Sequence, residues 1–375
     1  MTDMAETIIP ITEPDRVFKG HTDSVKAVAA FPNGGRMVTC SADKTLRLWD
    51  LKNGAMLKNM EGHRINVSAM ALSKDGKLIA SGDGNGELIV WDGDTGESLM
   101  ITSAAISESY YAIVISSLDF SPDGAVLMSV SLDRTMNLWR TNTWGVRSQI
   151  NVGEPIYRGR YSPSGKLLAI VTESYIQIWD PSKLECIAKI VCDLFSLAWT
   201  PDGTRLLSGG FENPTILEWD TSTWKQVGNR WRGHYGAIND LAVNSTGTLV
   251  VSASKDNHVH IWRISDRRTV AVFNLSHVVN CVTFSTDGKY ILCGCGDNNI
   301  TEWRIPEDAF LEVAPDAQTS SVSFSSFVVP LLPSHLAQEH LADEYCRGAR
   351  DRWCEFLTVF DSRVRSDHAS CRSYP

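Results

Sequence analysis

Three short patterns in this sequence place side chains that could bind a metal ion or a phosphate. Residues 82–86 read Gly-Asp-Gly-Asn-Gly, a combination found in loops that hold calcium or phosphate. Cys293 and Cys295 are two residues apart, which on a strand places both thiols on one face. His258 and His260 repeat that spacing. Neither pair has a second Cys or His pair nearby in sequence, as a closed metal site requires. We therefore predict turn and core roles for these residues, and no metal ion or cofactor.

Seven tryptophans at nearly even spacing reveal the elements that hold these residues. Each tryptophan closes a short β-branched or aliphatic run, and consecutive members are 40 to 48 residues apart. They are Trp49, Trp91, Trp139, Trp179, Trp219, Trp262 and Trp303. A period in the low forties is the signature of a repeat architecture, in which each unit buries its faces against its neighbours.

Each repeat contains short hydrophobic runs separated by turn residues. Residues 121–124 read Ser-Pro-Asp-Gly and residues 200–203 read Thr-Pro-Asp-Gly. Proline pre-sets φ for a turn and glycine accepts positive φ, so these are turns between strands. A second strand follows, then a tight turn, a third strand that ends at the tryptophan, and a more variable fourth strand. Four such strands make one twisted sheet, and packing the sheets radially buries both faces of each.

The first repeat carries a recognisable set of residues. Residues 20–50 begin with Gly-His, contain Phe-Pro-Asn-Gly at 31–34, and end in Trp-Asp. This pattern resembles the WD (WD40) repeat of β-propellers. The resemblance implies an all-β, seven-bladed propeller of four-stranded antiparallel blades. Because the repeat of this family is offset from the blade, it also implies that a strand from residues 8–18 closes the last blade. We expect the propeller to occupy residues 1–304.

Residues 305–375 do not follow the period. They are rich in Ser and Arg and contain no Lys. We expect an irregular or partly helical tail, with Ser334 as the cap of a short helix. A disordered terminus, a docking helix for a partner, and translated non-coding sequence all fit this change in composition.

The resemblance implies a buried hydrogen-bond relay of His, Ser or Thr, Asp and Trp in each blade. The first and sixth repeats have all four positions: His21, Thr39, Asp43 and Trp49, and His234, Ser252, Asp256 and Trp262. Incomplete sets are His63, Ser81 and Trp91; Ser129, Asp133 and Trp139; and Asp297 and Trp303. Asn85, Tyr111 and Cys293 stand at the Asp, His and hydroxyl positions of the second, third and seventh repeats. The fourth and fifth repeats keep little beyond Trp179 and Trp219, with Glu173 and Asn213 near the Asp position.

A histidine, a hydroxyl and a carboxylate could also form a catalytic set. The same constellation recurs here in several repeats, however, whereas an active site normally occurs once. Buried imidazole, hydroxyl, carboxylate and indole groups each need a partner, and in the relay they satisfy one another. We therefore predict a structural role for these residues and no catalytic residue.

Composition narrows the possible partners and location. The net charge is −9 with no block of Lys or Arg, which disfavours nucleic acid as the direct ligand. The apolar runs are far shorter than the ~20 residues of a membrane helix, and the first residues lack a signal peptide's basic start and apolar segment. Nine cysteines without staple-like spacing indicate a reducing compartment. We expect a cytoplasmic or nuclear protein that binds neither membranes nor small molecules.

The resemblance further implies that one face carries the partner site. In this family the loops leading into the first strands and the turns before the third strands lie together around the channel mouth. Those loops contribute Asn66, Tyr110, Asp193, Tyr235 and His277, and those turns contribute Leu132, Phe211 and Lys255. Several of these side chains are aromatic or apolar, as anchors of protein interfaces often are. The alternative is that they only pack the loops.

These observations favour a non-catalytic scaffold that presents loops and a central channel to protein or peptide partners. A narrower alternative is a substrate-receptor or adaptor subunit of a ubiquitin-ligase or chromatin complex. A propeller hydrolase with a metal ion in the channel belongs to a different class. It requires a set of acidic or His side chains pointing at the axis, and the sequence supplies no unique set.

Overall fold

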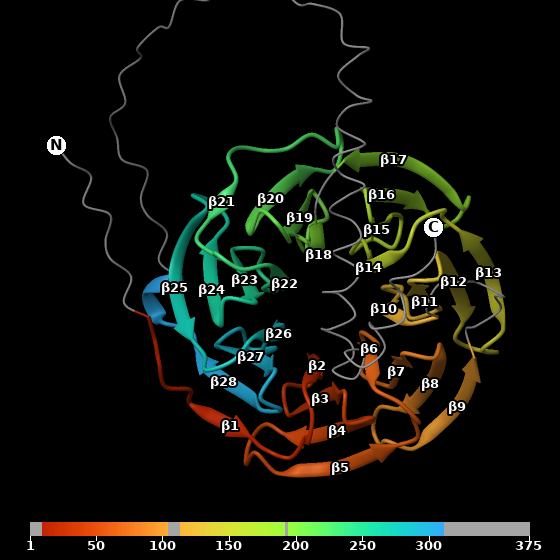
Figure 1. The fold of residues 1–375 in the computed structure, drawn as a ribbon, viewed down its shortest axis with the longest axis horizontal. Helices are drawn as coiled ribbons and strands as arrows, with labels where there is room; N and C mark the ends of the chain where they lie inside the picture. Colours follow the sequence, from red (N-terminus) through yellow and green to blue (C-terminus); the bar gives the residue numbers. More distant parts are fainter. Residues whose placement is uncertain (1–9, 104–112, 192–193, 311–375) are drawn as a thin grey trace, which may run out of the picture. The chain divides into compact units, whose positions relative to one another are not determined.

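The computed structural model describes residues 10–103, 113–191 and 194–310. In this part of the chain nearly every residue lies in a strand or in a turn between strands. The strands form seven four-stranded antiparallel sheets, which stand as blades around a common centre (Figure 1). The prediction of an all-β, seven-bladed propeller is confirmed.

Blades 1 to 6 each take four consecutive strands, from the innermost to the outermost. Blade 1 contains β2 (Val25–Ala30), β3 (Arg36–Ser41), β4 (Thr45–Asp50) and β5 (Met56–Glu61). Blade 2 contains β6 (Val67–Leu72), β7 (Leu78–Asp83), β8 (Glu87–Asp92) and β9 (Ser98–Ser103). Blade 3 contains β10 (Ile115–Phe120), β11 (Val126–Ser131), β12 (Thr135–Arg140) and β13 (Val146–Asn151). Blade 4 contains β14 (Ile156–Tyr161), β15 (Leu168–Thr172), β16 (Tyr175–Asp180) and β17 (Glu185–Val191). Blade 5 contains β18 (Leu194–Trp199), β19 (Arg205–Gly210), β20 (Thr215–Asp220) and β21 (Trp231–Arg232). Blade 6 contains β22 (Ile238–Val243), β23 (Leu249–Ser254), β24 (His258–Arg263) and β25 (Arg268–Asn274).

Blade 7 is completed by the N-terminal part of the chain, as the sequence predicts. Its order is β1 (Arg16–Phe18), β28 (Ile300–Arg304), β27 (Tyr290–Cys295) and β26 (Val279–Phe284). Strand β1 lies antiparallel to β28, with Val17 opposite Thr301. This pairing covers the outer edge of β28, the third strand of blade 7. The ring therefore closes with four strands in its last blade and no unpaired edge at β28.

The segment before β1 adds a contact that the sequence did not predict. Ile11 pairs in parallel with Phe273 of blade 6 rather than with blade 7. Its amide donates to the carbonyl of Val272 at 2.8 Å, and its own carbonyl accepts from the amide of Asn274 at 2.9 Å. The N-terminal chain therefore connects the outer strands of blades 6 and 7.

The tryptophans that define the repeat fill the interfaces between blades. Trp91 of blade 2 packs against Leu46 and Met60 of blade 1, and Trp139 of blade 3 packs against Leu88 of blade 2. Trp179, Trp262, Trp303 and Trp49 occupy the same place at four other interfaces. Truncating a buried aromatic side chain of this size typically costs about 3–5 kcal/mol. The period in the sequence is therefore the period of the core.

The packing continues a few residues past the last strand. Residues Glu307–Phe310 form a 3-10 helix, η1, and both Ile305 and Ala309 are buried in the cluster between blades 6 and 7. The remainder of the predicted tail lies outside the described residues. No helix in the described part of the chain has the length and apolar character needed to cross a membrane.

Candidate partner-binding face

Blades 1 and 6 contain complete four-residue relays. In blade 1, His21 Nδ1 is 2.8 Å from a carboxylate oxygen of Asp43, and Nε2 is 2.8 Å from the hydroxyl of Thr39. The Trp49 indole donates to that hydroxyl at 2.9 Å. The corresponding distances in blade 6 are 2.7–2.8 Å, among His234, Ser252, Asp256 and Trp262.

The two relay carboxylates are held as anions in closed surroundings. Burial acts to raise the pKa of Asp43, but the hydrogen bonds from His21 and Thr45 and the charge of His21 lower it below its usual range. The same balance, with His234 as the main partner, lowers the pKa of Asp256. The side chains of both histidines are fully buried. A substrate has no access to these groups, so the arrangement fits a structural role.

Blade 2 completes its relay with a residue that the sequence did not assign to it. Asp83, not Asn85, contacts His63, with 3.2 Å between the carboxylate and Nδ1. Asp83 is two residues earlier, at the end of strand β7, where blade 1 has Ser41. Its other oxygen accepts from the amides of Asn85 and Glu87 at 2.9 Å each. The carboxylate therefore reaches the same imidazole from the strand instead of from the turn.

The same corner of blade 2 gathers three possible metal ligands, His63, Asp83 and Glu87, whose ligand atoms lie within 4.8 Å of one another. Hydrogen bonds use the His63 and Asp83 atoms in the relay, and a Glu87 carboxylate oxygen lies 3.7 Å from His63 Nδ1. Trp91 donates to the Ser81 hydroxyl at 2.8 Å, and that hydroxyl lies 2.7 Å from His63 Nε2. His63 is therefore held between the Ser81 hydroxyl and the Asp83 carboxylate, as His21 is held in blade 1.

The hydroxyl partner of the tryptophan is present in blades 3 and 5. Trp139 donates to Ser129 at 2.9 Å, and Asp133 accepts from both the amide and the hydroxyl of Thr135. In blade 5, Trp219 donates to Ser208 at 2.7 Å. Ser208 is eleven residues before its tryptophan instead of ten, because the hairpin between β19 and β20 is one residue longer. That insertion hid the match at the sequence level.

In blades 4 and 7 the tryptophan indole donates its hydrogen bond to a side chain of its own strand. Trp179 donates to the Gln177 side chain at 3.2 Å, and Trp303 donates to the Thr301 hydroxyl at 2.8 Å. Cys293, which stands at the hydroxyl position of the seventh repeat, is therefore not the partner of Trp303. A thiol is a weak acceptor, and a hydroxyl two residues before the indole takes its place.

The metal-like pairs seen in the sequence lie in packed surroundings. His260 stacks on His234 with ring centroids 4.1 Å apart. Burial, followed by the charge of His234, lowers the pKa of His260 to about 3. Cys293 and Cys295 are both buried, and burial raises the pKa of the Cys295 thiol to about 12. His260 is thus neutral and Cys295 is a thiol, as expected of core residues.

A bulge near the start of each inner strand carries a side chain toward the next blade. In four blades this residue is Ser or Asn and donates to the carbonyl that begins the following inner strand. The donors and acceptors are Ser68 to Ile115, Ser116 to Ile156, Asn239 to Val279, and Asn280 to Val25. Blades 4 and 5 differ, because Tyr157 and Phe195 stand at this position.

These two aromatic residues begin a row of side chains along blades 4, 5 and 6, which we call the aromatic patch: Tyr157, Phe195, Phe211, Tyr235 and Lys255. Tyr157 is its buried end, only 7% exposed. Tyr157 and Phe195 have ring centroids 5.0 Å apart, and Phe195 and Phe211 are 4.5 Å apart. The Lys255 ammonium lies 4.6 Å above the Phe211 ring. The patch thus joins three blades by ring stacking and a cation–π contact.

Tyr235 is the most exposed member of the patch, with 74% of its surface accessible. Its hydroxyl donates to the carbonyl of Asp256 at 3.2 Å, and its ring meets His258 edge-on at 5.6 Å. A large aromatic side chain is therefore held in one place while most of its surface remains free.

Of the eight predicted contact residues, Phe211, Tyr235 and Lys255 lie in the patch. His277 is exposed, with Nδ1 3.7 Å from Asp297, and Asn66 is half-buried beside Gly84. The prediction of Leu132 as a contact is wrong, because it is only 1% exposed. An aliphatic side chain at this position gains by packing under the loop. Tyr110 and Asp193 lie outside the described residues.

Sequence reasoning missed Tyr157 and Phe195. Both follow the first residue of an inner strand, where the other blades have Lys, Ser or Asn. Comparing this position across the seven repeats would have identified them as the two aromatic exceptions.

The inner strands, all within the described part of the chain, contain two carboxylates, Asp119 and Asp240, and both contact other blades. Asp119 accepts from the amide of Tyr161 at 2.7 Å. Burial raises its pKa to about 6, against the charge of Arg160. Asp240 accepts from the Val282 amide at 3.1 Å and pairs with Arg158 of blade 4 at 3.3 Å. These carboxylates bind groups of other blades, which does not match the acidic set that a channel-metal hydrolase requires.

Comparison with known proteins identifies the repeats independently. A family model described as "WD domain, G-beta repeat" matches residues 12–50, 54–92, 108–140, 224–263 and 268–304, half of the chain in total. The model matches nothing between residues 140 and 224, the stretch that contains most of blades 4 and 5. These two blades have the most altered relays and carry the aromatic pair of Tyr157 and Phe195.

Several curated proteins resemble this chain. It is 27% identical to Protein tipD of Dictyostelium discoideum over 259 residues. This alignment covers 66% of this chain and 41% of that protein. It is 24% identical over 311 residues to Autophagy-related protein 16 of Arabidopsis thaliana, covering 80% and 59%. It is 26% identical over 251 residues to Transcriptional corepressor LEUNIG_HOMOLOG of Arabidopsis thaliana, covering 65% and 30%. The chain thus spans less than two thirds of each of these relatives.

Proposed function

The chain belongs to the WD40-repeat family, and on that premise we propose that it is a non-catalytic scaffold whose aromatic patch binds a protein or peptide partner. The observation that carries this proposal is the 74% exposed Tyr235, whose hydroxyl bonds the carbonyl of Asp256, while the ammonium of the preceding Lys255 lies over the Phe211 ring. Large, rigid aromatic side chains lose little conformational entropy on binding and dominate the energy of many protein interfaces.

The position of the patch supports a binding role over a packing role. At the same bulge, Ser and Asn of other blades bridge to the next blade by hydrogen bonds, so the fold itself does not require aromatic residues there. Lys255 adds a cation beside the rings. A partner that combines an apolar or aromatic side chain with an acidic group matches this surface.

The narrower form of the proposal is an adaptor or substrate-receptor subunit of a ubiquitin-ligase or chromatin complex, in the cytoplasm or nucleus. One relative is named a transcriptional corepressor, and another is named an autophagy-related protein. The similarity to the corepressor favours a chromatin complex over a ubiquitin-ligase complex. The partners recovered from cells decide between these two complexes.

The test is affinity purification of the full chain with Phe211→Ala and Tyr235→Ala together. We expect a partner recovered with the wild type to be lost, while circular dichroism and the melting temperature stay unchanged. Leu99→Ala is the matched control, because Leu99 is an apolar residue 52% exposed on the outer strand of blade 2. A folded double variant that retains every partner places the binding site elsewhere.

A further inference from the structure

A pocket of about 200 Å³ lies between blades 3 and 4. It is formed by the turn β10–β11, the turn β14–β15, the turn β16–β17 and strand β13. These turns end the first and third strands, so the pocket opens on the face opposite the aromatic patch. Pockets that enclose a drug-sized ligand usually measure about 300–1,000 Å³. This one fits a single side chain.

Arg147 gives the pocket a charge that the other blades lack at this place. Trp139 pairs with Val146 and the residue before it pairs with Ser148, so Arg147 is the bulged residue of the outer strand. The bulged residues of four other outer strands are all aliphatic: Leu57, Leu99, Ile187 and Val270. A cation is therefore not needed for the fold at this position.

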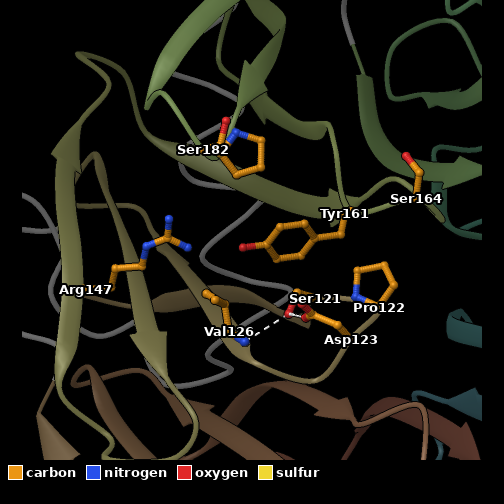
Figure 2. A pocket seen from close by; sticks show the side chains of 10 residues that line it. Ser121, Pro122, Asp123, Val126, Arg147, Tyr161, Ser164 and Ser182 are labelled. Carbon is orange, nitrogen blue, oxygen red and sulfur yellow. Dashed lines mark hydrogen bonds between the residues drawn. The ribbon is translucent and has the colours of Figure 1, made fainter.

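Tyr161 supplies a second donor. Figure 2 shows its hydroxyl pointing toward the Arg147 guanidinium across the pocket. Burial, and then the charge of Asp119, raises the pKa of Tyr161 well above its usual value, so the hydroxyl stays protonated and able to donate. Within the described parts of the chain, the Arg147 guanidinium and the Tyr161 hydroxyl have no hydrogen-bond or ion-pair partner.

The rest of the lining narrows the kind of anion. Pro122, Val126 and Pro181 present aliphatic surface, which suits the methylene groups of a side chain. Asp123 also lines the pocket, and hydrogen bonds from the Ser121 hydroxyl and the Ala125 amide lower its pKa. A fixed anion at the pocket's edge disfavours a doubly charged phosphate more than a singly charged carboxylate.

We propose that this pocket binds the carboxylate of a glutamate side chain from an extended segment of a partner protein. Arg147 donates to both carboxylate oxygens, as a planar guanidinium does best, and Tyr161 donates to one of them. The prolines and Val126 cover the methylene groups. This site is separate from the aromatic patch and does not depend on it.

The test is a titration of the full chain with N-acetyl-glutamate N-methylamide, followed by NMR chemical shifts. We expect saturable binding that moves the Arg147 side-chain signal. N-acetyl-glutamine N-methylamide, which has the same shape without the charge, is expected to bind at least about tenfold more weakly. Inorganic phosphate at pH 7.5 is expected to bind more weakly than the glutamate probe.

Three variants separate the proposed contacts from general charge effects. Arg147→Leu is expected to lose at least about tenfold in affinity, and it should fold because leucine occupies this position in blades 1 and 2. Tyr161→Phe keeps the ring and is expected to lose about two- to tenfold. Arg140→Leu removes an exposed arginine of β12 outside the pocket lining and is expected to change nothing.

Four results would overturn the proposal. They are equal binding of the glutamate and glutamine probes, unchanged binding by Arg147→Leu, tighter binding of phosphate than of the glutamate probe, and absence of any shift with the glutamate probe. None of these results bears on the aromatic patch, whose variants leave Arg147 and Tyr161 intact.

Discussion

At the scale of single residues, the chemistry-bearing side chains of this protein connect loops to strands. His21 and His234 each join a carboxylate in a tight turn to a hydroxyl on the neighbouring strand, and neither imidazole is exposed. The same residue types serve a catalytic triad where a substrate reaches them. Access to substrate, more than residue type, separates the two uses.

Replacing Asp256 by Ala should destabilise the propeller by about 1–3 kcal/mol, because it leaves Nδ1 of the buried His234 imidazole without its carboxylate partner. The folded-state pKa of Asp256 is lowered. Its contribution is therefore fully present above the unfolded-state pKa of about 4 and is lost progressively as the pH falls from there through the lower folded-state pKa. Urea unfolding at pH 7 and at pH 3.5 measures both effects.

The gap in unfolding free energy between wild type and Asp256→Ala should narrow at the lower pH. Thr246→Ala, on an exposed turn of the same blade, is the control and should cost far less. A variant as stable as wild type at pH 7, or one that stays folded and loses a turnover activity, would contradict the structural role.

At the scale of strands and hairpins, the sequence predicted the regular parts well and the substituted parts poorly. The tryptophan spacing and the Pro-Gly turns were sufficient for seven four-stranded blades, because the same packing constraint acts in every copy. The relay was misplaced where a partner moved along the chain: by two residues at Asp83 and by one residue at Ser208. Fixed spacing does not describe such shifts, since the side chain needs only to reach the same point in space.

The sequence also failed to predict which turn residues are buried and which are exposed. Leu132 and Lys255 hold equivalent turn positions, yet Leu132 is buried and Lys255 is half-buried over a Phe211 ring. Where the side chain of a turn residue points depends on the neighbouring blade, which the repeat pattern does not encode. For the same reason, contacts between blades such as Tyr157 with Phe195 could be found only in the structure.

The β7–β8 hairpin allows a direct test of the shifted relay. Asp83→Ala should cost about 1–3 kcal/mol, because it removes the partner of His63 and the acceptor for two turn amides. Asn85→Ala should cost about 0.5 kcal/mol or less, as a substitution away from buried partners does. Chemical denaturation of both variants gives the comparison, and a larger loss for Asn85→Ala would restore the turn position as the relay site.

At the scale of the whole molecule, stability depends on closing a ring of similar units. Strand β1 supplies the outer strand of blade 7, and Phe18 is buried in the cluster between blades 7 and 1. Ile11 adds the contact to blade 6. The two contacts are made by different residues, so they can be removed one after the other.

Deleting residues 1–19 should lower the melting temperature strongly and promote aggregation, because it exposes the edge of β28 and empties the Phe18 site. Of the described strand pairings, deleting residues 1–12 removes the Ile11 bridge and leaves β1 in place, so the melting temperature of this variant should fall between those of wild type and the longer deletion. Differential scanning calorimetry with light scattering measures both properties. Equal melting temperatures for wild type and the longer deletion would show that β1 does not close the ring. A shorter deletion as damaging as the longer one would instead make the bridge from Ile11 to Phe273 the main closure, with β1 secondary to it.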